Sequence, residues 1–190
     1  PSNPVVRPPV ALPGSFRGLS HEGALVYTLA TRTDAPADAN ATSRTWLEAA
    51  AYDGTAAHWV AGLDVANLSK GDSASVEITP DGSVWLAQTT DSGKSHALSL
   101  LRVSDTAKFE KRATLALDAA VQSLDHVGDV ATISFGSQVR LFRVADGPSI
   151  APVGQAFDLG CLLQGLHRLS GGPETGYWAP LGDYGSAPLP

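Results

Sequence analysis

Leu-Leu-Arg-Val-Ser-Asp at residues 100–105 and Leu-Phe-Arg-Val-Ala-Asp at residues 141–146 are the stretches that decide the fold of this 190-residue chain. Both end at the same kind of turn, and each follows another apolar run that begins after a turn rich in glycine and aspartate. Repeats of roughly 40 to 50 residues that consist only of strands are typical of a β-propeller. The sequence therefore predicts an all-β fold built from repeated four-stranded units.

Short turns divide each predicted unit into its strands. Glycine next to an acidic residue marks the first turn of three units, at residues 22–23, 81–82 and 128–129. Glycine and aspartate adopt the positive φ angles that tight hairpins require. We expect strands at residues 16–20, 24–31, 45–52 and 57–65; at 75–79, 83–89, 96–103 and 109–117; at 121–125, 130–135, 139–144 and 151–159; and, in a shorter fourth unit, at 162–169, 176–181 and 184–189.

Two of these strands read as continuous apolar runs, Ala-Leu-Val-Tyr at 24–27 and Val-Trp-Leu-Ala at 84–87. A strand with one face in water alternates apolar and polar residues, so a continuous run predicts cover on both faces. Each blade of a propeller lies between two neighbours, whereas a two-sheet sandwich gives cleaner alternation. The pattern favours a propeller of about four blades over an immunoglobulin-like or jelly-roll fold.

The whole chain, residues 1–190, is predicted to form one domain. Residues 1–14 are a proline-rich segment, and the blades span residues 15–65, 73–117, 121–159 and 162–190. Residues 5–12 precede the first blade as a fourth strand would, so they are expected to complete the last blade and close the ring. Proline suits such an outer edge strand, where the missing N–H faces solvent. The alternatives are a fragment of a larger propeller or another all-β fold.

Composition excludes several classes of function. The net charge of −6, with basic residues scattered along the chain, argues against a nucleic-acid surface. No apolar stretch approaches the roughly 20 residues that span a bilayer. No dinucleotide fingerprint, Cys-x-x-Cys, His-Glu-x-x-His or calcium loop occurs, so the sequence predicts no cofactor and no metal site.

Position in the repeat selects the candidate ligand-binding residues. The first strand of each blade lines the channel of a propeller, and polar groups of these strands and their turns then converge near the axis. Histidine and carboxylate groups that converge are suited to a small ligand. The alternative is a set of hydrated polar groups without a ligand. The selected residues are His21, Glu77, Asp125, His126, His167 and Arg168.

The tryptophans divide into two groups by strand position. Trp85 and Trp178 lie within second strands and are expected to pack between blades. Trp46 and Trp59 lie on outer strands, a position compatible with exposure as a sugar-binding platform.

Three segments carry a resemblance to a known family. Residues 16–28 (Phe-Arg-Gly-Leu-Ser-His-Glu-Gly-Ala-Leu-Val-Tyr-Thr), residues 51–54 (Ala-Tyr-Asp-Gly) and residues 178–185 (Trp-Ala-Pro-Leu-Gly-Asp-Tyr-Gly) are similar to segments of bacterial secreted proteins with a C-terminal β-propeller domain. The resemblance implies an extracytoplasmic or secreted location. It implies no activity and no catalytic residues.

These observations predict a non-catalytic binding or scaffold module that mediates protein or surface interactions. The expected partner is another protein or a glycan, and the oligomeric state is left open. The alternative is a carbohydrate-active hydrolase or lyase with a polar site at the propeller axis. The two differ in whether the selected polar residues meet in one concave pocket.

Overall fold

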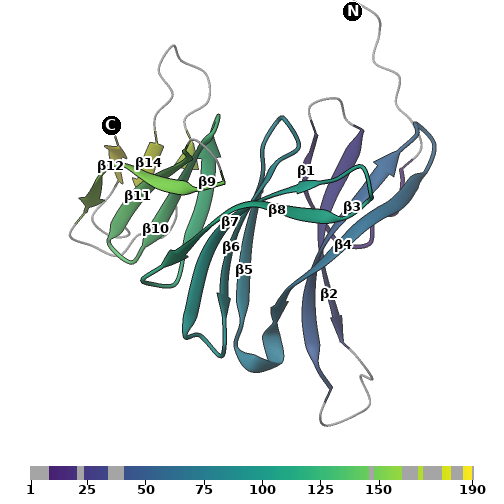
Figure 1. Cartoon of the computed structure of the whole chain (residues 1–190), viewed down its shortest axis with the longest axis horizontal. Coiled ribbons are helices and arrows are strands. Elements are labelled where there is room, and N and C mark those ends of the chain that lie inside the picture. The colour runs from purple at the N-terminus through teal and green to yellow at the C-terminus, as the bar shows by residue number, and fades with distance from the viewer. Residues whose placement is uncertain are drawn as a thin grey trace, which may run out of the picture.

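The computed structural model describes residues 9–20, 24–33, 41–145 and 148–159, and the backbone of residues 167–168, 177–180 and 186–189. This part of the chain is all-β, as predicted, and forms three four-stranded antiparallel sheets and one three-stranded sheet (Figure 1). The 3₁₀ turn η1 (Leu68–Lys70) is the only helical element in those ranges. No helix among the described residues is long and apolar enough to cross a membrane.

Strand order follows the sequence in every sheet, because each strand pairs with the next through a hairpin. The predicted strands of the first three units agree with the observed ends to within two residues. The first sheet contains β1 (Ser15–Leu19), β2 (Leu25–Thr33), β3 (Ser43–Tyr52) and β4 (Ala57–Asn67); the second β5 (Ser73–Ile78), β6 (Val84–Thr90), β7 (Ser95–Val103) and β8 (Phe109–Leu117); the third β9 (Ser123–Val127), β10 (Val130–Phe135), β11 (Gln138–Val144) and β12 (Ile150–Asp158); the fourth β13 (His167–Arg168), β14 (Tyr177–Pro180) and β15 (Ser186–Leu189).

The two matched stretches of the sequence end in the same hydrogen-bonded turn. Ser104 N–H donates to the carbonyl oxygen of Lys108 at 2.8 Å, and Ala145 N–H donates to that of Ser149 at 2.9 Å. Each bond closes the turn between the third and fourth strands of its sheet. The sequence repeat is therefore a structural repeat of the second and third sheets.

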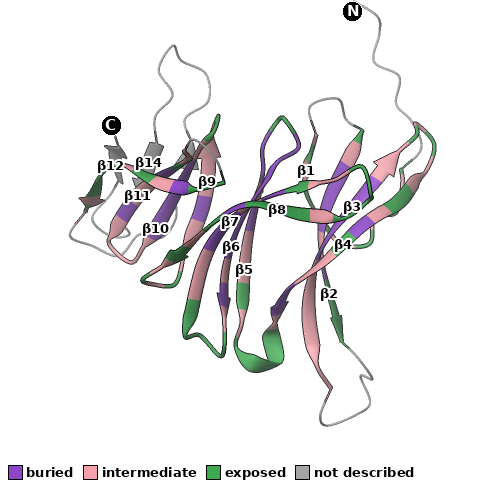
Figure 2. Cartoon of the chain, in the orientation of Figure 1, coloured by how far each residue is buried: buried purple, intermediate pink, exposed green. Residues whose placement is uncertain are grey.

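The second sheet is covered on both faces, as its continuous apolar run predicts. Val84 and Leu86 of β6 belong to a core shared with Tyr27 of the first sheet. Trp85 and Ala87 point the other way, into a second core that includes residues of the third sheet. Figure 1 shows β5–β8 between the other two four-stranded sheets, and Figure 2 shows buried residues along the middle of these strands. Each fully buried large apolar side chain contributes about 1.5–3 kcal/mol of hydrophobic stabilisation.

The first strands of the three four-stranded sheets lie next to one another. β1 contacts β5, and β5 contacts β9. The approach of β1 to β5 needs glycine at position 18, because a Cβ added there would lie 2.7 Å from Cβ of Ile78. The sheets thus meet along their first strands.

Three four-stranded sheets occur where four blades were expected, and each sheet is open. The fourth sheet has three strands within the described ranges. Of the segment expected to complete it, residues 9–12 form no strand, and residues 1–8 lie outside the described residues. Ala11, Leu12 and Pro13 instead line a pocket together with residues of the first sheet. The short contact at Gly14, where an added Cβ would lie 2.2 Å from the carbonyl oxygen of Leu29, also places this segment on β2.

Candidate functional site

Three of the six residues selected from the sequence lie together between the second and third sheets. Glu77 comes from β5, and Asp125 and His126 come from β9. One ligand atom of each residue lies within 4.8 Å of the others. Glu77 Oε2 is 3.8 Å from His126 Nδ1.

Strand alternation explains why these side chains meet. Val76 and Ile78 of β5 face the core shared with the first sheet, so Glu77 between them faces the third sheet. On β9, Leu124 belongs to the second core, and His126 two residues later lies on the same face. The carboxylate of Asp125 accepts a hydrogen bond from the backbone N–H of His126 at 2.7 Å, which keeps it close to the imidazole.

The strand registers show that the selected positions are equivalent. Glu77 is opposite Trp85, His126 is opposite Ala131, and His167 of β13 is opposite Trp178. Each partner is the second residue of its strand. Glu77 and His167 were selected because they belong to first strands, and His126 because it precedes the turn after one; their common register is seen only in the structure.

The other three selected residues are not placed in the cluster. His21 lies outside the described residues. His167 and Arg168 form β13, of which only the backbone is described. Their part in a common site therefore stays a prediction.

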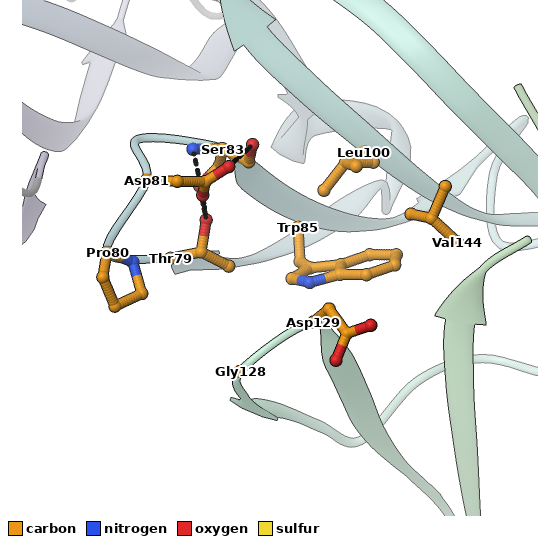
Figure 3. Close-up of a pocket in the computed structure, with 9 residues that line it drawn as sticks. All are labelled: Thr79, Pro80, Asp81, Ser83, Trp85, Leu100, Gly128, Asp129 and Val144. Atoms are coloured by element: carbon orange, nitrogen blue, oxygen red, sulfur yellow. Dashed lines mark hydrogen bonds between the residues drawn. The ribbon is translucent and has the colours of Figure 1, made fainter. Parts of the chain in front are cut away.

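A pocket of about 320 Å³ lies nearby, between the β5–β6 turn and the β9–β10 turn (Figure 3). Its central side chain is Trp85, which is 1% exposed as a residue and was correctly predicted to pack between sheets. Figure 3 shows the indole between Asp129 and the side chains of Leu100 and Val144. The pocket is lined by Thr79, Pro80, Asp81, Ser83, Trp85, Leu100, Gly128, Asp129 and Val144.

Hydrogen bonds within the turn hold one wall of this pocket in place. Asp81 Oδ1 accepts from Thr79 Oγ1 and from the backbone N–H of Ser83, and Asp81 Oδ2 accepts from Ser83 Oγ at 2.9 Å. Gly82 has φ of 80°, a conformation that glycine adopts without strain. Tyr27 of the first sheet donates its hydroxyl to the carbonyl oxygen of Gly82 at 2.9 Å. The turn is thus closed by its own hydrogen bonds and held to the first sheet by Tyr27.

The electrostatics of the turn follow from these contacts. Desolvation raises the pKa of Asp81, but the hydrogen bonds from Thr79 and Ser83 and the charge of Arg102 outweigh it, so its pKa lies below the usual value. Burial raises the pKa of Tyr27, which Arg102 partly offsets and Asp81 reinforces. Asp81 is therefore an anion and Tyr27 a neutral donor at neutral pH.

Replacing Asp81 by asparagine is expected to lower the free energy of unfolding by about 0.5–1 kcal/mol at pH 7, because hydrogen bonds to a charged acceptor are stronger than those to a neutral one but solvent screens this exposed carboxylate. The folded-state pKa lies below the unfolded one, so this stability is present above the unfolded pKa and is lost as pH falls through the folded pKa. Urea unfolding at pH 7, 5 and 3.5 should show a wild-type advantage that shrinks below about pH 4.

Asp129→Asn is the matched control for this prediction. Asp129 is an exposed carboxylate in the corresponding turn of the third sheet, and its replacement is expected to change stability by less than about 0.5 kcal/mol. An Asp81→Asn deficit that is the same at all three pH values would contradict the role given to the charge.

A second pocket, of about 340 Å³, lies on the first sheet beneath Ala11, Leu12 and Pro13. It contains Glu48, which is 2% exposed and forms an ion pair with Arg32. Trp59 also lines it and is 66% exposed. This pocket is therefore lined by both a buried carboxylate, Glu48, and an exposed aromatic ring, Trp59.

The Trp85 pocket could not be identified from the sequence. The segment from Thr79 to Trp85 reads as an ordinary hairpin turn followed by a core strand, and the opposite wall comes from a different sheet. The available signal is the alternate spacing of Thr79, Asp81 and Ser83, which places three hydrogen-bonding side chains in one turn.

Comparison with known proteins finds no family model that matches the chain and no curated protein with significant similarity to it. The resemblance to secreted propeller proteins therefore remains a prediction. What is known of the site is its geometry: an apolar pocket at Trp85 and a separate cluster of Glu77, Asp125 and His126 at the same pair of sheets.

Proposed function

We propose that this chain is a non-catalytic binding module that uses the Trp85 pocket to hold an apolar side chain of a protein partner. The observation that carries this proposal is the pocket itself, which opens between turns of two different sheets and has an indole at its centre. Binding sites in proteins are commonly concave, mostly apolar and bordered by a few polar groups. A volume of about 320 Å³ is sufficient for one large side chain.

Charge indicates which residues should flank that side chain in the partner. Asp129 is exposed at the rim, Asp81 is ionised in the adjoining turn, and the chain as a whole carries a net charge of −6. Complementary charges favour correct docking and speed association. The proposed partner segment therefore presents an aromatic or large aliphatic residue next to lysine or arginine.

The proposed scaffold is a β-propeller in which each sheet is one blade. Consecutive strand order, contacts among β1, β5 and β9, and cover on both faces of the second sheet support it. A ring of about four blades closed by residues 5–12 is one form of this proposal, and a part of a larger propeller is the other. The position of residues 11–13 on the first sheet favours the second form. Resemblance to secreted propeller proteins supports an extracytoplasmic location.

The enzyme alternative draws its support from Glu77, Asp125 and His126, which converge as a hydrolase or lyase site at the axis would require. However, the pocket beside Trp85 is lined by none of the three. A reacting substrate must lie within hydrogen-bond reach of its acid and base. Binding through the pocket is therefore the better supported function.

Capped dipeptides test the proposal directly. Acetyl-Phe-Lys-amide is expected to shift the amide resonances of Ser83 and Asp129 and the indole N–H of Trp85 in ¹⁵N-labelled protein, with a dissociation constant on the order of 1 mM. Acetyl-Phe-Glu-amide should bind several-fold more weakly, because its carboxylate approaches Asp129.

Two substitutions distinguish peptide binding in the pocket from binding elsewhere on the surface. Val144→Phe fills the pocket and should abolish the shifts, whereas Ala116→Phe on an exposed position of β8 should leave them unchanged. Equal binding of the two peptides, or binding that survives Val144→Phe, would refute the proposal. A response of the same resonances to glucose and not to the peptides would assign the pocket to a glycan.

A further inference from the structure

One histidine nitrogen between the second and third sheets has no partner. His126 Nδ1 is buried and makes no hydrogen bond, and the side chain as a whole is 12% exposed. The nearest carboxylate oxygen, Glu77 Oε2, is 3.8 Å away, which is too long for a hydrogen bond. A buried polar atom without a partner destabilises the folded state. His126 Nδ1 therefore lacks a partner among the described residues.

Two carboxylates lie beside this nitrogen. The ligand atoms of Glu77, Asp125 and His126 are all within 4.8 Å of one another. Two carboxylates at such a distance repel each other electrostatically unless a cation lies between them. A bound cation would remove this repulsion and would give His126 Nδ1 the partner that it lacks.

We propose that Glu77, Asp125 and His126 form a binding site for a divalent transition-metal ion of the zinc type. Imidazole nitrogen with carboxylate oxygen is a donor set that zinc accepts, and three protein ligands leave one position open. Ligand atoms of a tetrahedral zinc site with bonds of about 2.0–2.1 Å lie roughly 3.4 Å apart. The His126–Glu77 separation of 3.8 Å is already close to this value, and the other pairs of ligand atoms lie within 4.8 Å.

The site would also connect two sheets. Glu77 belongs to β5, and the other two ligands belong to β9. A metal that binds the folded chain and not the unfolded chain stabilises the folded state by mass action. The site is independent of the proposed peptide pocket, because none of the three ligands lines that pocket.

Titration of the full chain, without an affinity tag, with zinc chloride tests the proposal by isothermal calorimetry. Wild-type protein should bind one equivalent, and Co²⁺ in place of Zn²⁺ should produce visible absorption bands of a low-coordinate site. His126→Ala should weaken zinc binding at least about 100-fold, and Glu77→Gln at least about 10-fold, since each removes a direct ligand.

The matched control is His58→Ala. His58 Nε2 lies 3.0 Å from Asp53 Oδ2, but both side chains are more than half exposed, at 65% and 51%. This variant should bind zinc as wild type does. Far-UV circular dichroism establishes whether each variant is folded. If His126→Ala does not fold, Glu77→Gln still tests the proposal, because it nearly preserves the size of a partly exposed side chain.

Three results would overturn the proposal. The first is that wild-type protein binds no zinc. The second is that Glu77→Gln and His126→Ala bind zinc with wild-type affinity, which would assign any binding to an adventitious ion. Loss of binding in His58→Ala alone would place the metal on the exposed pair instead.

Discussion

Replacing Trp85 by alanine is expected to lower the free energy of unfolding by about 4 kcal/mol, the largest effect of any single substitution considered for this chain. Trp85 is 1% exposed and packs in the core between the second and third sheets. Its removal deletes a large apolar surface and leaves a cavity next to the existing pocket. Since small domains are stable by only about 5–15 kcal/mol, much of the total is lost. Urea unfolding followed by far-UV circular dichroism measures the change.

Trp59→Ala provides the matched control on the same residue type. Trp59 is 66% exposed on β4, so its removal is expected to cost less than about 1 kcal/mol. Trp85→Phe keeps most of the apolar volume and should give an intermediate loss, which preserves the test if the alanine variant does not fold. Equal losses for Trp59→Ala and Trp85→Ala would mean that the second sheet is not covered on this face.

Replacing Arg32 by alanine is expected to lower the free energy of unfolding by about 3 kcal/mol, because it leaves a buried carboxylate without its cation. Glu48 is 2% exposed, and its Oε2 has no hydrogen-bond partner even in the native protein. Arg32 itself is 52% exposed, which places the effect at the low end for a buried pair. Chemical denaturation of the variant and the wild type at pH 7 gives the difference.

The Arg44–Asp64 pair on the neighbouring strands is the control. Its side chains are 42% and 31% exposed, so Arg44→Ala should cost less than about 1 kcal/mol. The double variant Arg32→Met with Glu48→Met should recover most of the stability, since an apolar pair of similar size needs no hydrogen bonds. If Arg32→Ala were no worse than Arg44→Ala, Glu48 would have to be far more hydrated than the fold implies.

The hairpins could be predicted because their signals are local. Asp81-Gly82 lies in a turn with φ of 80° at the glycine, and Gly128 likewise has a positive φ of 58°. The run at 84–87 also indicated correctly that both faces of β6 are buried, since its alternate residues enter two different cores. Local turn chemistry and hydrophobic pattern therefore sufficed for the strands and their order.

Contacts between different sheets could be predicted only where they follow from the position of a residue in the repeat. Glu77 and His126 were selected because polar groups of the first strands and their turns were expected to converge near a common axis, and the structure places Glu77 Oε2 3.8 Å from His126 Nδ1. The same argument assigned the N-terminal segment to the last sheet, whereas its residues 11–13 lie on the first. No local signal distinguishes these two positions, because a proline-rich segment can lie against either sheet. The Trp85 pocket was missed for a related reason, since its walls come from separate sheets.

The sheets meet along their first strands, and the proposed blade arrangement depends on these contacts. The most direct measurement is a ¹³C-edited NOESY spectrum that examines contacts between the α-protons of Gly18 on β1 and the side chain of Ile78 on β5. The structure predicts strong cross-peaks, because a Cβ at Gly18 would lie 2.7 Å from Ile78 Cβ and 3.3 Å from Ile78 Cγ2. If Ile78 shows cross-peaks only within its own sheet, the first strands do not meet and the blade arrangement is wrong.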